Sequence, residues 1–105
     1  MALTRDFKKL VQARAVKDRA FREGLFVEAI EAFTEGDLET AKGLLRDYIN
    51  ATVGFQRLAA VTRISDKSLM RMFGPRGNPQ AGNLGSVIAH LKKETKVRLH
   101  VRAGP

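Results

Sequence analysis

The sequence predicts an all-α fold in one domain, residues 1–105, in which a helical hairpin precedes a pair of short helices and a short β-strand follows. Over most of the chain, apolar residues recur at intervals of three and four, the spacing of a helix face. Glycine and proline interrupt this pattern and mark the joints between helices. We expect N-terminal helices over residues 1–52, a helical core over 53–95 and the strand over 96–102.

Three helices are expected in the first half of the chain. The first runs from about Thr4 to Val16, and Asp18 is suited to cap the second, because its carboxylate accepts the free amide protons of a first turn. Gly36 and Asp37 end the second helix and begin the third. The apolar stripes of these two helices are Phe21, Leu25, Phe26, Ala29, Ile30 and Phe33, then Ala41, Leu44, Leu45, Tyr48 and Ile49. With so short a joint, the second and third helices should form an antiparallel hairpin.

Two short helices follow a break at residues 52–54. They span residues 55–62 and 66–73, and residues 63–65 form the turn between them. Residues 74–79 include two prolines and two glycines, which exclude a helix interior and predict a loop.

The pattern of side chains in residues 55–73 is that of a helix-turn-helix. Such a motif requires a small residue where its helices approach, which Ala59 supplies, and a buried aliphatic residue in the turn, which Ile64 supplies. The second helix should bury one edge and expose the other. The inner residues are Leu69, Met72 and Phe73, and the outer ones are Asp66, Lys67, Met70 and Arg71. This division suits a helix that enters the major groove of DNA, although a plain helical hairpin shares part of the pattern.

The end of the chain contains a last helix and a strand. Asn83 is placed to cap that helix, whose inward residues are Leu84, Val87, Ile88 and Leu91. Val97, Leu99 and Val101 then alternate with Lys96, Arg98, His100 and Arg102, which is the period of a strand. A lone strand in a helical domain exposes unpaired backbone groups. We therefore expect it to pair with the same strand of a second copy and to help form a homodimer.

The net charge of +8 favours a polyanionic partner such as nucleic acid. The charge is unevenly distributed, because residues 18–37 hold six acidic and two basic residues, whereas residues 55–76 hold five basic residues and one acidic residue. Ordinary solvated helix faces are the alternative interpretation of both runs.

Several functional classes find no support in the sequence. It contains no cysteine, and its two histidines have no carboxylate or thiol at ligand spacing, so neither a metal site nor a cofactor is expected. A Walker loop, a Cys-His pair and a Gly-x-Ser-x-Gly elbow are missing, so we expect no enzyme. The first residues do not resemble a signal peptide, and no apolar run approaches the roughly 20 residues of a membrane span. A cytoplasmic protein is therefore expected.

Three segments of the second half carry a resemblance to a known family. They are residues 58–62 (LAAVT), residues 65–71 (SDKSLMR) and the loop at 74–79 (GPRGNP). They resemble the lambda-repressor-like (XRE-type) DNA-binding domains of HigA-type antitoxins, also called probable addiction-module antidote proteins. The loop is the most specific segment, because in that family a Ser/Gly-Pro-x-Gly-Asn-Pro loop follows the recognition helix. Residues 3–8 (LTRDFK) and 46–52 (RDYINAT) resemble its flanking segments.

The resemblance implies a bacterial, dimeric repressor that binds double-stranded operator DNA. In antitoxins it also implies a small ribonuclease-type toxin as a partner and repression of the shared operon. Family repressors place the start of the second helix on base edges, which makes Asp66, Lys67 and Arg71 candidate base contacts. Flanking positions become candidate phosphate contacts, and these are Gln56, Ser65, Ser68, Arg76 and Asn78. The acidic face of Glu23, Glu28, Glu31 and Glu35 would suit a basic toxin.

Two residues depart from the family pattern. Arg63 stands where the family commonly has a glycine in a left-handed turn, and a non-glycine residue there costs about 1 kcal/mol. Either the turn relaxes or Arg63 serves to reach a phosphate. Asp66 would repel phosphates unless it caps the helix or accepts a hydrogen bond from a cytosine amino group. A protein-interaction module that no longer binds DNA therefore remains an alternative. A transcription factor of the same fold without a toxin is a further alternative, which the neighbouring gene would decide.

Overall fold

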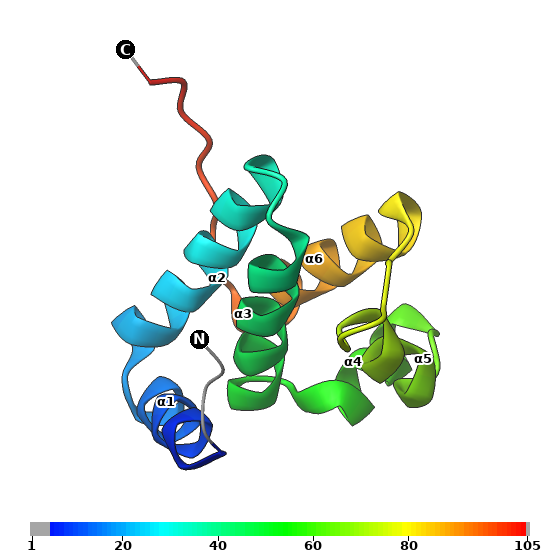
Figure 1. Ribbon diagram of the computed structural model, residues 1–105, viewed down its shortest axis with the longest axis horizontal. Helices are drawn as coiled ribbons and strands as arrows, with labels where there is room; N and C mark the ends of the chain where they lie inside the picture. The colour runs from blue at the N-terminus through cyan, green and yellow to red at the C-terminus, as the bar shows by residue number, and fades with distance from the viewer. Residues whose placement is uncertain (1–4, 105) are drawn as a thin grey trace.

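The structure, a computed structural model, describes residues 5–104 and contains six helices in that range (Figure 1). They are α1 (Arg5–Lys17), α2 (Arg19–Thr34), α3 (Leu38–Ala51), α4 (Gly54–Thr62), α5 (Asp66–Met72) and α6 (Ala81–Thr95). The predicted all-α fold is confirmed. Within residues 5–104, no helix combines the length and apolar character needed to cross a membrane.

Two aspartates cap helices of the N-terminal half, as predicted. Oδ1 of Asp18 accepts a hydrogen bond from the amide of Phe21 at 3.0 Å, and Oδ1 of Asp37 accepts one from the amide of Thr40 at 3.2 Å. Between α2 and α3, Gly36 has a φ of 80°, the left-handed conformation that turns the chain back. The two helices consequently lie side by side as the expected hairpin (Figure 1).

The core begins between α2 and α3 and continues beneath the shorter helices. The rings of Phe26 and Tyr48 stack with their centroids 4.8 Å apart. The same buried cluster includes Leu58 of α4, Leu69 of α5 and Leu91 of α6. The short helices α4 and α5 therefore rest on an apolar surface that longer helices provide.

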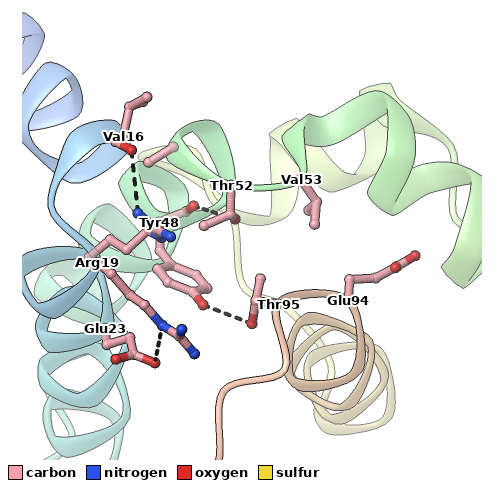
Figure 2. Close-up of a pocket in the computed structure, with 10 residues that line it drawn as sticks. Val16, Arg19, Glu23, Tyr48, Thr52, Val53, Glu94 and Thr95 are labelled. Atoms are coloured by element: carbon pink, nitrogen blue, oxygen red, sulfur yellow. Dashed lines mark hydrogen bonds and ion pairs between the residues drawn. The ribbon is translucent and has the colours of Figure 1, made fainter.

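A hydrogen bond ties the end of α6 to α3. The hydroxyl of Tyr48 donates to Oγ1 of Thr95 at 2.9 Å (Figure 2). Thr95 in turn donates to the carbonyl oxygen of Leu91 at 2.7 Å. Burial is the main cause that raises the pKa of Tyr48 above its ordinary value. The end of α6 is thereby fixed against the N-terminal hairpin.

Two expectations for the C-terminal part are not met. Asn83 does not cap α6, because the backbone is already helical from Ala81 and the amide of Leu84 donates to the carbonyl oxygen of Gln80 at 2.9 Å. The strand expected at 96–102 is also absent, since the structure contains no strand within residues 5–104. A strand needs a ladder partner, and residues 98–102 lie beside α2, whose backbone groups are bonded within the helix.

Part of the alternating pattern in the tail is nevertheless visible. Val97 is buried and Leu99 is half-buried against the core, whereas Arg98 is exposed between them. The pattern ends at Val101, which is 94% exposed. Beyond this point the tail extends away from the helices (Figure 1).

Replacing Tyr48 by Phe should lower the free energy of unfolding by about 1 kcal/mol at neutral pH, because the hydrogen bond to Thr95 is lost while the ring stack remains. That corresponds to roughly 4–8 °C in Tm, measurable by circular dichroism. Because the pKa of Tyr48 is raised in the folded protein, the wild type loses stability as the pH rises past the ordinary value of 10.0. The difference in free energy of unfolding between the wild type and Tyr48→Phe should therefore shrink at high pH. Thr95→Val removes the acceptor instead. If that variant is as stable as the wild type, the hydrogen bond between Tyr48 and Thr95 does not stabilise the fold.

Candidate nucleic-acid interface

The connection between α4 and α5 consists of residues 63–65. Arg63 ends α4 with φ 61° and ψ 22°, and its amide donates to the carbonyl oxygen of Ala59 at 2.9 Å. Ser65 then caps α5, because its Oγ accepts from the amide of Ser68 at 3.1 Å. Ile64 packs against the core between these two residues. The chain thus makes a tight turn that sets the angle between the two helices.

Of the two alternatives left open for Arg63, relaxation of the turn does not occur. The residue holds the left-handed conformation that the family pattern gives to glycine, and its side chain is exposed. The backbone strain is therefore present, and the guanidinium extends into solvent beside the turn.

One edge of α5 is buried and the other is exposed. Leu69 and Phe73 are buried, and the ring of Phe73 lies against that of Phe55 with centroids 6.4 Å apart. Lys67 and Arg71 are exposed on the other edge, as is Met70, at 51%. The predicted separation is confirmed for these residues, although Phe73 directly follows the last residue of α5. Met72, expected inside, and Asp66, expected outside, are both half-buried.

The end of α5 and the following loop are held by two cations from α3. Nζ of Lys42 donates to the carbonyl oxygens of Gly74 at 2.9 Å and Gly77 at 2.8 Å. A guanidinium nitrogen of Arg46 donates to the carbonyl oxygen of Phe73 at 3.2 Å. Cations at this position satisfy carbonyl groups that a helix end leaves unpaired and also interact favourably with the helix dipole.

The loop packs closely against α5 at Gly77. A Cβ at this position would overlap the carbonyl oxygens of Arg71 and Met72, so only glycine permits this approach. Close packing thus explains why the second glycine of the GPRGNP segment, Gly77, is a glycine. The approach also keeps the next residues of the loop near the outer edge of α5.

Four of the eight predicted site residues surround one hollow. Ser68 and Arg71 of α5 line it together with Arg76 and Asn78 of the loop, and Asn83 of α6 completes its rim. Lys67 is exposed one residue before Ser68. Gln56 is exposed on the first turn of α4 and does not line this hollow.

The hydroxyl groups and the carboxylate at the start of α5 have local partners. Oγ of Ser65 donates to Oγ of Ser68 at 2.8 Å, and Oδ1 of Asp66 accepts from the amide of Lys67 at 2.8 Å. A carboxylate in the first turn interacts favourably with the helix dipole. This geometry supports the interpretation in which Asp66 stabilises the helix start.

The cations of α5 and the loop are not neutralised by nearby acids. Within residues 5–104, the ion pairs involve other cations, and none includes Lys67, Arg71 or Arg76. By contrast, Arg57 of α4 makes a salt bridge with Glu94 of α6, with Nη2 2.8 Å and Nε 2.9 Å from Oε1. Lys67, Arg71 and Arg76 therefore carry positive charge that no ion pair of the described residues offsets.

Lys42 and Arg46 contact this region, and the sequence reasoning missed them. Lys42 is 2% exposed and shares the buried face of α3 with Leu45 and Ile49, at positions three and seven residues further on. A lysine on an apolar stripe was the signal that could have found it. Its two carbonyl acceptors, however, are 32 and 35 residues away in sequence, and no local pattern connects them to it.

A second hollow lies where the N-terminal hairpin meets the end of α6 (Figure 2). Its polar side chains bond to one another: Arg19 pairs with Glu23 at 3.6 Å, and Tyr48 donates to Thr95. Oγ1 of Thr52 donates to the carbonyl oxygen of Tyr48 at 2.7 Å. These groups form a polar joint between two parts of the fold, whereas the cations around the first hollow remain available to a ligand.

No protein-family model, curated protein or solved structure matches this chain. Within residues 5–104, no group of three or more His, Asp or Glu side chains is arranged to hold a metal ion.

Arg63→Gly should raise the free energy of unfolding by about 1 kcal/mol, because glycine adopts the left-handed conformation without strain. Chemical denaturation measures this change. Arg63→Ala is the matched control and should give no gain, since alanine keeps the strain while removing the charge. An equal gain in both variants would attribute the effect to charge repulsion and contradict the backbone explanation.

Proposed function

We propose that α4 and α5 form a helix-turn-helix and that the protein is a homodimeric, sequence-specific DNA-binding transcriptional regulator. The observation that carries this proposal is the division of α5 into a buried edge, with Leu69 and Phe73, and an exposed edge, with Lys67 and Arg71. A recognition helix requires this division, because it must pack on its own domain and still present polar groups to a groove.

The proposal assigns different tasks to the residues around the hollow. Arg71 is placed to read base edges, since a guanidinium offers paired donors that match guanine in the major groove. Lys67 serves at or near the bases, while Arg76 and Asn78 contact phosphates on the flanking backbone. Ser65, Ser68 and Asp66 shape the helix start, and Gln56 contacts a phosphate from α4. Phosphate contacts supply much of the affinity and base contacts the choice of site.

The finer proposal is that of a HigA-type antitoxin that represses its own operon. It rests on the sequence resemblance and on the acidic outer face of α2, where Glu28, Glu31 and Glu35 are exposed. A small, basic ribonuclease-type toxin fits this face by charge. The alternative is a regulator of the same fold without a toxin. A gene for such a toxin next to this one, whose toxicity is suppressed on co-expression, favours the antitoxin.

The wild-type protein should bind duplex DNA from the region upstream of its own gene more tightly than a random duplex of equal length. Fluorescence anisotropy at two salt concentrations measures both affinities. The affinity should fall steeply as salt rises, with a slope of about 0.9 in log–log terms for each phosphate contacted. Absence of duplex binding at low salt would leave the protein-interaction module as the better description.

Arg71→Ala should relax discrimination at one base pair of the preferred duplex, with a loss of about 1–3 kcal/mol in binding free energy. The measurement compares the variant on the preferred duplex and on duplexes with single base changes. Lys17→Ala is the control, because Lys17 is also an exposed cation but lies on α1, at the opposite side of the fold (Figure 1). If Arg71→Ala weakens preferred and random duplexes equally, Arg71 contacts phosphate and reads no base.

We also propose that the C-terminal tail provides the contact between two copies. A chain shortened after Leu99 keeps Val97 and Leu99 on the core and loses the exposed Val101. The full chain should sediment as a dimer in analytical ultracentrifugation and the shortened chain as a monomer at the same concentration. A dimer that survives the shortening would assign the contact to another surface.

A further inference from the structure

A chain of polar contacts crosses the molecule from the surface of the N-terminal hairpin to the loop after α5. It starts at Glu39, which is 71% exposed and whose Oε1 lies 3.0 Å from Nζ of Lys42. The buried ammonium then donates to the carbonyl oxygens of Gly74 and Gly77. Arg46, one turn further along α3, adds its bond to Phe73. We call Lys42 and Arg46 the α3 clamp.

The α3 clamp acts on the part of the chain that brings the loop to the recognition helix. Arg71 lies two residues before the carbonyl of Phe73, and Arg76 and Asn78 flank Gly77 directly. Gly77 cannot move toward α5, because its backbone already contacts the carbonyl groups of Arg71 and Met72. It cannot move away without breaking the bond from Lys42. The position of the loop is therefore fixed from both sides.

A lysine is an unfavourable choice for simple packing. Its ammonium loses hydration in a site where only 2% of the residue is exposed, and a well-packed apolar side chain would often be as stable or more stable. The ammonium does, however, provide three donors from one point, and all three have acceptors here: two carbonyl groups and one carboxylate. The arrangement specifies a loop geometry that an apolar residue would leave undefined.

We propose that Lys42, assisted by Arg46, is a positioning residue for DNA reading: it holds Arg76 and Asn78 in register with Arg71. This inference rests on the proposed DNA binding. Residues that dock on the phosphate backbone fix the orientation of a recognition helix and so determine which base edges its side chains reach. Loss of the α3 clamp should reduce discrimination between duplexes and not merely the amount of folded protein.

The test compares the wild type with Lys42→Met, in which the side chain keeps its length and flexibility but donates no hydrogen bond. The probe is a duplex that the wild-type protein selects from a random library. A second duplex differs from the first at one base pair, the pair at which Arg71→Ala no longer discriminates between bases. In parallel, hydrogen exchange measured by NMR follows the amide of Gly77, which donates to the carbonyl oxygen of Gly74 at 3.1 Å.

In Lys42→Met, the preference for the selected duplex should fall about tenfold or more. The slope of log affinity against log salt concentration should decrease by about the amount that one phosphate contact contributes. The amide of Gly77 should exchange about tenfold faster, while amides of α2 change less than about twofold. Lys17→Met is the matched control and should leave all three quantities unchanged. Glu39→Gln should have little effect, because the two backbone carbonyl groups still hold the ammonium.

An unchanged duplex preference in folded Lys42→Met would overturn the inference, whether or not Gly77 exchanges faster. Equal acceleration of all amides, with the preference retained by the folded fraction, would also overturn it and reduce Lys42 to a structural role. If Lys42→Met does not fold, Gly77→Ala displaces the loop from the other side and should cause the same loss of preference. Failure of the proposed function is distinguishable, because the wild type would then select no duplex at all.

Discussion

A helix of seven residues is too short to be stable by itself, and α5 has this length. Its shape therefore depends on what holds it from outside. Leu69 and Phe73 hold its inner edge in the core, Ser65 caps its beginning, and Lys42 and Arg46 bind the carbonyl groups at its end. The outer edge is free of these tasks, and this is why Lys67 and Arg71 can be exposed there without partners on the protein.

The features that could be predicted from the sequence are those with local causes. A capping aspartate lies three residues from the amide it binds, and an apolar stripe repeats within one helix, so Asp18, Asp37 and the two edges of α5 were correctly predicted. Four of the eight residues assigned to the site surround one hollow for the same reason, because α5 and its loop are consecutive in the chain.

The features that escaped prediction depend on contacts between distant segments. Nothing around Lys42 indicates that its acceptors follow α5, and only the packing of α3 beneath that loop brings them together. The tail shows the reverse case. Its alternation of apolar and basic residues describes a side-chain pattern, but a strand also requires a neighbour with unpaired backbone groups, and α2 has none to offer. Sequence periodicity reports the side-chain pattern alone and says nothing about whether such a neighbour is present.

The bond between Tyr48 and Thr95 has a consequence for the geometry of an assembly. The tail leaves α6 directly after Thr95, at Lys96, whose φ of 61° sets its direction. The start of the tail is therefore held in a fixed position relative to α3, the same helix that holds the loop beside α5. In the proposed dimer joined through the tails, the distance between the two α5 helices would then be set by α3 in each subunit. If the proposed DNA binding holds, such a dimer would measure the spacing between half-sites and tolerate few insertions between them.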